Sequence, residues 1–216
     1  MKFIENTKSY FGERAIRKYL KKHSRSMASC NIKEAKTIGI LFNATHQVSF
    51  EIVKELVKNI SGRKNTIDVL GFVDSKQLID HYLYRKGFDF FTRSQLNWYY
   101  KPKNSSVDTF IKKPFDILLD LSLDNPFPIR YIMTCSAAKF KTGMFYKNQD
   151  YLDLMIDIEK EIQNMNRIQH EVEVDRKNNH RKNREVEKII DKKVQTEIQL
   201  NFLINQLVHY LSLIKK

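Results

Sequence analysis

The sequence predicts an α/β protein built on a single, mostly parallel sheet of five or six strands. Short apolar runs alternate, along residues 37–157, with segments whose apolar residues recur at helical spacing. The runs are nearly continuous, which is typical of strands that are buried on both faces of a parallel sheet. Because right-handed crossovers join such strands, we expect a doubly wound, Rossmann-like arrangement.

The expected elements follow one another in order along this core. The apolar runs predict strands at Thr37–Ala44, Thr66–Val73, Phe88–Thr92, Phe115–Leu121, Phe140–Phe145 and Tyr151–Ile156. Helical spacing predicts intervening helices near Ser49–Ile60, Lys76–Tyr84, Val107–Ile111 and Ile129–Ala138. Pro126 and Pro128 precede the last of these helices, where proline is well tolerated. Residues 37–157 therefore form the predicted core.

Residues 1–36 precede the sheet and predict a basic amphipathic helix followed by a linker. They contain ten Lys and Arg residues against three Glu. Apolar residues recur at helical spacing, and cations occupy much of the other side. The cations are Arg14, Arg17, Lys18, Lys21, Lys22 and Arg25. The helix is either docked on the core with a solvated charged face, or an arm that contacts phosphates or an anionic membrane surface.

Residues 158–216 predict a long, charged C-terminal helical extension. Residues 158–193 favour a charged helical hairpin, with a partly disordered insertion as the alternative. The tip of such a hairpin is basic, and it consists of Arg176, Lys177, Arg181, Lys182 and Arg184. Residues 194–216 are strongly apolar at helical spacing and predict a helix that packs on the core.

Charge is the largest compositional signal. The net charge of +13 favours a polyanionic partner such as RNA, DNA or an anionic membrane surface. The same abundance of Lys, Asn and Ile is typical of an AT-rich genome, so codon usage is an alternative source of the charge. Two cysteines without a pairing pattern, no apolar signal segment and no membrane-length apolar run lead us to expect a cytoplasmic protein.

Polar residues follow several predicted strands, and ligands of open parallel sheets bind at these strand ends. They form a possible pocket of Asn43, Thr45, His46, Asp74, Asp120, Ser122 and Asp124. Asp120 and Asp124 fit general acid–base chemistry or Mg²⁺ binding, but strand-terminal Asp residues more often cap the next helix. The pocket therefore predicts a possible ligand site without an assigned reaction.

The sequence lacks the usual motifs for nucleotide binding, serine hydrolysis and zinc binding. The loop after the first strand, NATHQVS, has no glycine, so it matches neither a dinucleotide-binding nor a P-loop pattern. No GxSxG sequence occurs, and the six histidines lack the paired spacing of a zinc site. We therefore assign no catalytic residue, no cofactor and no metal, and we favour a protein that is not an enzyme.

One aromatic segment stands beside cations. Trp98, Tyr99 and Tyr100 are followed by Lys101 and Lys103. Aromatic rings next to cations are typical of sites where nucleic-acid bases stack. Packing of the rings in the core is the more common alternative.

Three motifs suggest a relationship: LNWYYKP at Leu96–Pro102, FDILLDLSL at Phe115–Leu123 and AKFKTG at Ala138–Gly143. With them, residues 37–157 together with the C-terminal helix resemble an uncharacterised family of small, basic proteins from Bacteroidota that carries a domain-of-unknown-function label. The resemblance implies a Rossmann-like fold and no particular activity. The core is more weakly similar to one half of the heptosyltransferase N-terminal domain, which implies at most a degenerate glycosyltransferase-like fold.

Four functional hypotheses remain open. The favoured one is a non-enzymatic protein whose basic helix and basic hairpin tip bind RNA, including a ribosomal particle. A second is a small-ligand site at the strand ends. A third is a peripheral membrane protein that inserts Phe11, Ile16, Tyr19 and Leu20. The fourth is a protein partner that binds the C-terminal helices.

Overall fold

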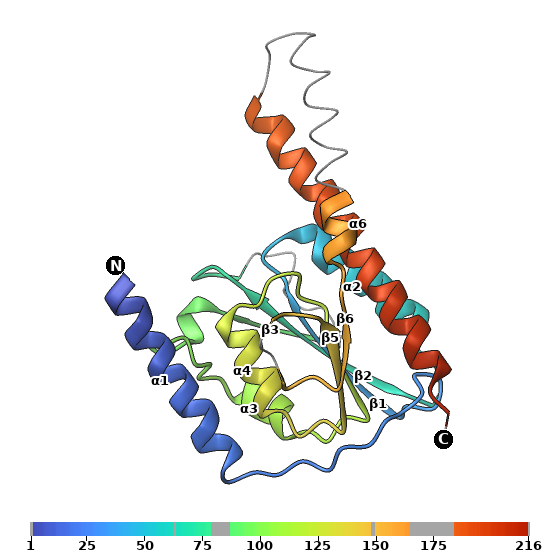
Figure 1. Cartoon of the computed structure of the whole chain (residues 1–216), viewed down its shortest axis with the longest axis horizontal. Coiled ribbons are helices and arrows are strands. Elements are labelled where there is room, and N and C mark those ends of the chain that lie inside the picture. The colour runs from blue at the N-terminus through green and yellow to red at the C-terminus, as the bar shows by residue number, and fades with distance from the viewer. Residues whose placement is uncertain (1, 63, 79–86, 148–149, 165–183, 216) are drawn as a thin grey trace.

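A computed structural model describes residues 2–62, 64–78, 87–147, 150–164 and 184–215. It contains a six-stranded sheet with the order β3-β2-β1-β4-β5-β6, in which every neighbouring pair is parallel. The strands are β1 Thr37–Asn43, β2 Thr66–Val73, β3 Phe88–Thr92, β4 Ile117–Asp120, β5 Phe140–Met144 and β6 Leu154–Ile156. The predicted α/β, Rossmann-like fold is confirmed (Figure 1).

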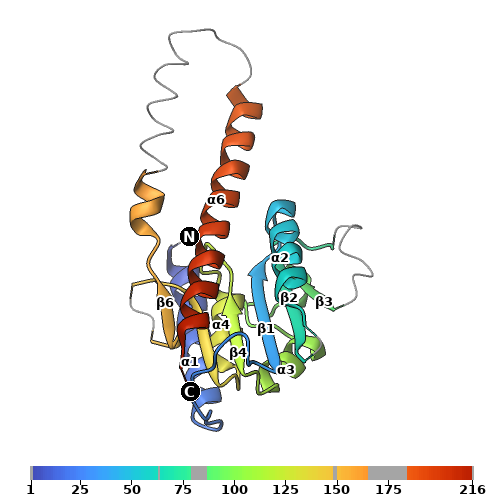
Figure 2. The ribbon, with the colours of Figure 1, turned by 90° about the vertical axis from the view of Figure 1, so that its right-hand side faces the viewer.

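Helices cover both faces of this sheet. They are α1 Lys2–Leu20, α2 Gln47–Ile60, α3 Ser105–Lys112, α4 Phe127–Cys135 and α6 Arg184–Leu213, with a short 3₁₀ helix, η2, at Arg93–Gln95. Residues 159–164 are also helical, and they lie beside α6 in Figures 1 and 2. Of the predicted helix at Lys76–Tyr84, residues 76–78 are not helical and the rest lies outside the described residues.

The strands alternate their side chains between two apolar layers. Ile38, Ile40 and Phe42 of β1 belong to the layer under α2 and α6. Leu41 belongs to the opposite layer, under α1, α3 and α4, where Ile16 of α1 is also buried. Figure 1 shows α1, α3 and α4 on one side of the sheet and α2 and α6 on the other. Burial on both faces explains why the strands form nearly continuous apolar runs in the sequence.

The long helix α6 runs without interruption through residue 194, where the sequence predicts a segment boundary. Leu203, Leu207 and Leu211 lie in its buried stripe against the sheet. Among the residues described, no helix is both long enough and apolar enough to cross a membrane.

Gly39 lies in β1 between β2 and β4, where the space above the strand is filled by two large side chains. A Cβ atom at this position would lie 2.8 Å from Leu118 Cδ1 and 2.9 Å from the Phe115 ring. Only glycine therefore permits Phe115, which is fully buried, to pack against the central strand.

We expect Gly39→Val to lower the free energy of unfolding by about 1–3 kcal/mol, because the added methyl groups must displace buried neighbours. Urea unfolding followed by circular dichroism measures the change. The matched control is Gly62→Ala, where the nearest atom to a new Cβ lies 3.8 Å away. Equal stability of the two variants would contradict the tight packing at Gly39.

Candidate functional site

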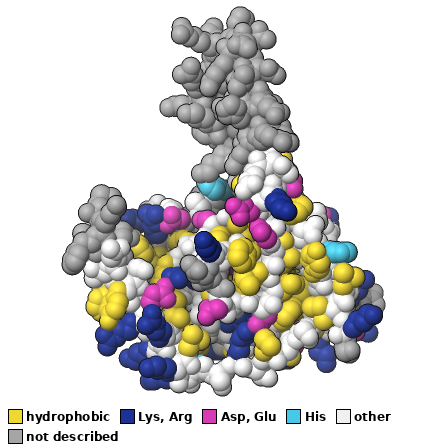
Figure 3. Space-filling model, in the orientation of Figure 1, with side chains coloured by type: hydrophobic (Ala, Val, Ile, Leu, Met, Phe, Trp, Pro, Cys, Tyr) yellow, Lys and Arg dark blue, Asp and Glu magenta, His cyan; other side chains and the backbone are white. Residues whose placement is uncertain are grey.

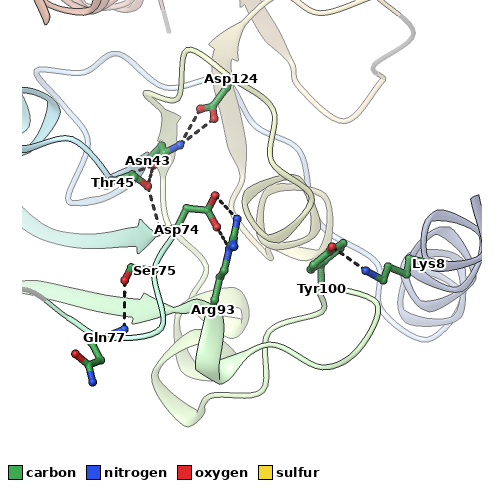
Figure 4. Close-up of polar contacts among 9 residues, drawn as sticks. All are labelled: Lys8, Asn43, Thr45, Asp74, Ser75, Gln77, Arg93, Tyr100 and Asp124. Carbon is green, nitrogen blue, oxygen red and sulfur yellow. Dashed lines mark hydrogen bonds and ion pairs between the residues drawn. The ribbon is translucent and has the colours of Figure 1, made fainter. Parts of the chain in front are cut away.

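The structure brings four of the predicted strand-end residues into one chain of hydrogen bonds (Figure 4). Asn43 Nδ2 donates to both carboxylate oxygens of Asp124, at 3.1 and 2.9 Å. Asn43 Oδ1 accepts from the backbone and hydroxyl of Thr45, at 3.0 and 2.6 Å. Thr45 Oγ1 in turn accepts from the backbone of Asp74 at 2.9 Å. These polar groups therefore bind the loops after β1, β2 and β4 to one another.

A cleft of about 330 Å³ lies at the same edge of the sheet, between the end of β2 and the start of α4. Its charged groups also have partners inside the molecule. Arg93 forms a two-fold ion pair with Asp74, and Lys8 Nζ donates to Tyr100 Oη at 2.9 Å. The Arg130 guanidinium forms an ion pair with Glu13 of α1. The cleft is thus lined by cations that are already bound to groups of the protein.

Asp120 and Ser122 do not take part in this chain of hydrogen bonds. Both are buried in the protein, and neither lines the cleft. Ser122 N donates to Asp120 Oδ1 at 2.9 Å. Burial raises the pKa of the Asp120 carboxyl to about 7. His46 is exposed at the start of α2, and its side chain does not cap that helix. The seven predicted pocket residues therefore do not converge on one space.

The raised pKa of Asp120 predicts a pH-dependent loss of stability. The folded state keeps this carboxyl protonated between its ordinary pKa of 3.8 and its folded value of about 7, whereas the unfolded chain releases the proton. The free energy of unfolding therefore falls as pH rises through this window, by at most about 1.4 kcal/mol per pH unit. In Asp120→Asn, which keeps the acceptor for Ser122 N, this contribution is absent.

Urea unfolding of both proteins between pH 4.5 and 7.5 tests this prediction. The stability of Asp120→Asn relative to the unmodified chain should increase with pH, most steeply between about pH 5 and 6.5, and level off as the pH passes 7. A difference that does not change with pH would show that Asp120 is ionised in the folded state.

The cations of α1 lie on the outside of the molecule. Arg14, Arg17 and Lys18 are exposed, as are Lys21 and Lys22 just after the helix. Figure 3 shows Lys and Arg side chains gathered at the lower left, over the C-terminal half of α1. The opposite side of α1 packs on the core, so the docked alternative and the exposed basic face are both present in one helix.

The aromatic segment after β3 forms a tight turn that faces α1. Asn97 Oδ1 accepts from the backbone N–H groups of Tyr99 and Lys101, at 3.1 and 2.9 Å. Tyr100 has a left-handed backbone with φ of 65°, and its N–H donates to the Asn97 carbonyl at 3.0 Å. Asn97 thus fixes the turn that presents the neighbouring rings and Lys101 to the helix.

Between α1 and this turn lies a groove of about 390 Å³, which we call the basic groove. Its walls combine cations from both segments with aromatic rings, and no acidic residue lines it. The lining consists of Phe11, Arg14, Ala15, Lys18, Tyr19, Lys22, His23, Tyr99, Lys101 and Tyr131. Three of the predicted RNA-contacting cations and two members of the aromatic segment therefore meet at one surface.

Among the described residues, the cations of the basic groove have no carboxylate partners, unlike Arg25, Arg93 and Arg130. Within the part of the chain that the structure describes, no ion pair involves Arg14, Lys18, Lys22 or Lys101. Lys101 instead lies 5.4 Å from the centre of the Tyr131 ring. These positive charges are consequently available to an external anion.

Arg25, the last cation of the predicted N-terminal patch, is bound inside the protein. Its Nη1 and Nη2 donate to Asp153 Oδ2 and Oδ1 at 2.7 and 2.5 Å, and Nη1 also donates to the Lys139 carbonyl at 3.1 Å. The Asp153 side chain is only 8% exposed. Arg25 therefore fastens the segment after α1 to the sheet and does not line the groove.

We expect Arg25→Gln to lower the free energy of unfolding by about 1–3 kcal/mol, because it leaves a mostly buried carboxylate without its charged donor. Urea unfolding measures the loss, and Arg17→Gln, at an exposed residue of α1, is the control. Equal stability of the two variants would show that Arg25 does not fasten this segment.

The predicted basic hairpin tip is not tested by the structure. Arg176, Lys177, Arg181 and Lys182 lie outside the described residues, and Arg184 is the first residue of α6. Among the described residues, no group of three or more His, Cys, Asp or Glu side chains is arranged to hold a metal ion. Burial raises the pKa of Cys135, below the groove, to about 12, which disfavours a reactive thiolate.

Comparison with known proteins identifies a family. A model described as a family of unknown function, DUF6913, matches residues 8–173, which is more than half of the chain. The chain belongs to this family. The match confirms the resemblance to an uncharacterised family, begins further toward the N-terminus than expected and ends before α6. Neither a curated protein nor a solved structure matches the chain.

Proposed function

We propose that this DUF6913 member is a non-enzymatic, cytoplasmic RNA-binding protein that contacts the phosphate backbone through its basic groove. One observation supports the proposal above all others. Segments 79 or more residues apart in the sequence place Arg14, Lys18, Lys22 and Lys101 around a single groove without a carboxylate in its lining. Phosphate contacts of this kind supply affinity without sequence preference and weaken steeply as salt displaces the protein from the RNA.

The same structure weakens the membrane alternative. Insertion into a bilayer surface requires the apolar face of α1 to be free. Ile16, at the centre of that face, is only 6% exposed and packs in the layer under α1, α3 and α4. Tyr19 is half-buried. An inserted α1 would therefore have to leave the core.

A small ligand at the strand ends is the second candidate function, and the 330 Å³ cleft favours it. An anion entering this cleft would have to exchange with internal contacts of Arg93 or Arg130, because both guanidinium groups already bind carboxylates. The basic groove offers an anion cations without such competition, so we rank RNA binding first.

The test is the affinity for a fluorescein-labelled, 20-nucleotide RNA, measured by fluorescence anisotropy between 50 and 300 mM KCl. The variant is the triple substitution Arg14→Gln, Lys18→Gln and Lys22→Gln. We expect it to lose at least about 10-fold in affinity at 100 mM KCl, and the slope of log K against log salt to fall by about 2. Sedimentation of a lysate with and without RNase then shows whether the bound RNA is ribosomal.

The matched control removes the same charge outside the groove, by Lys33→Gln, Lys58→Gln and Lys64→Gln, all of them exposed. This control should retain affinity within about two-fold. Equal losses in the two triple variants would show that net charge rather than the groove binds RNA, and absence of binding at 50 mM KCl would overturn the proposal.

A further inference from the structure

Four aromatic rings form an exposed cluster at one end of the basic groove. Phe11 lies between Tyr10 and Trp98: its ring centre is 5.6 Å from that of Tyr10 and 5.0 Å from that of Trp98. The ring centres of Trp98 and Tyr99 are 5.2 Å apart. Three of the rings remain open to solvent: Tyr10 is 62%, Trp98 56% and Phe11 38% exposed. Such a concentration of exposed apolar surface is typical of a binding site.

The cluster is held in place before any partner binds. Trp98 follows Asn97, whose side chain and backbone close the turn. Its ring is tilted by 63° to that of Phe11 and by 84° to that of Tyr99, in edge-to-face contacts. Edge-to-face contacts are the preferred arrangement of aromatic pairs, so two neighbouring rings support the indole although more than half of it is exposed.

The cluster and the basic groove are continuous. Phe11 and Tyr99 belong to both, since they contact Trp98 and also line the groove with Arg14, Lys18 and Lys101. A polymeric ligand whose charged backbone lies along these cations would therefore have its side groups next to the rings.

We propose that the ligand of this surface is single-stranded RNA, with an unpaired base stacked on Trp98 and the adjacent phosphates in the basic groove. This inference rests on the proposed RNA binding and adds the class of RNA. Every base has a π-face that stacks on an aromatic ring, whereas in a duplex these faces are covered by neighbouring base pairs. The unpaired cations favour a polyanion as the ligand, and the exposed rings favour a polyanion whose bases are unstacked.

Trp98 is the only tryptophan of the chain, so its fluorescence reports on this one position. Three probes separate stacking from charge: a single-stranded 12-nucleotide oligouridylate, a 12-base-pair RNA duplex, and a heparin oligosaccharide, which carries charge without bases. We expect the oligouridylate to quench the Trp98 emission at saturation, and the duplex and heparin to leave it nearly unchanged while they still bind.

Variants of Trp98 provide the second measurement, by anisotropy of the labelled oligouridylate and by its competition with heparin. Trp98→Ala should lose about 10-fold in affinity for the oligouridylate and less than two-fold for heparin, and Trp98→Phe should retain most of the affinity. Tyr210→Ala, at a 47% exposed ring of α6, is the matched control and should change neither affinity. Thermal unfolding confirms that each variant is folded.

The two proposals fail differently. Binding of the oligouridylate without quenching, and with full affinity in Trp98→Ala, overturns base stacking but leaves groove binding intact if the Arg14, Lys18 and Lys22 triple variant still loses affinity. Equal quenching by heparin would also overturn stacking. If none of the three probes binds at low salt, the proposed RNA binding fails and this inference fails with it.

Discussion

The arrangement of this molecule depends on the need to cover a parallel sheet on both faces. β1 is buried on each side, because its odd and even side chains enter two separate apolar layers. α2 and α6 cover one face of the sheet, and α1, α3 and α4 cover the other. Ile16 points inward, and the close approach of α1 to α4 is possible because Gly12 leaves room for the Phe127 ring. The docking of α1 thereby decides which of its residues remain outside.

The cations follow from that docking. Arg14 and Lys18 are four residues apart and therefore share one side of α1, and Lys22, in the turn just after the helix, lines the same groove. With Ile16 buried, this side faces the turn that Asn97 holds after β3. The basic groove is therefore a product of packing, since the same contacts that bury one side of α1 present the other side beside Lys101.

The sequence could predict the sheet because burial on both faces leaves nearly continuous apolar runs. It could also predict that Asn43, Thr45, Asp74 and Asp124 meet, since the carboxyl ends of parallel strands share one edge. It could not predict that Asp120 is withdrawn from this edge, because its burial depends on residues of later segments. Gly143 of β5 lies against Asp120, and Tyr146 donates a hydrogen bond to the Ser122 carbonyl at 3.2 Å.

Two other outcomes also depend on tertiary contacts. Arg25 looks like a continuation of the basic patch, but its partner Asp153 is 128 residues away. The residues around Trp98 in the sequence fit either a core or a binding surface. Only the folded structure, in which Trp98 packs on Phe11 and remains 56% exposed, places the ring at the surface. The spacing of residues within α1 and within the aromatic segment contains no information that the two segments meet.

Buried ionisable groups are often markers of an active site, and two such groups, Lys141 and Asp120, lie in this sheet. Burial lowers the pKa of Lys141 to about 7, and its Nζ donates to the Thr134 carbonyl at 3.0 Å. Neither Lys141 nor Asp120 lines the basic groove or the strand-end cleft. A group that exchanges protons with a substrate must reach it. The basic groove and the strand-end cleft thus offer charged and aromatic surface, whereas Lys141 and Asp120 are packed within the sheet.

The pairing of charges also bears on the origin of the net charge. If codon usage alone supplied the lysines, they should be spread over the surface without regard to one another or to nearby carboxylates. Elsewhere in the described chain Lys54, Lys113 and Lys139 pair with Glu51, Asp68 and Asp116, whereas exposed cations such as Lys33 and Lys64 stand singly. The groove instead gathers Arg14, Lys18, Lys22 and Lys101 without a carboxylate in its lining. Mutual repulsion opposes such a gathering, and a bound phosphate backbone relieves it. The gathering of four cations around one groove thus favours a polyanionic ligand more strongly than the total of +13 does.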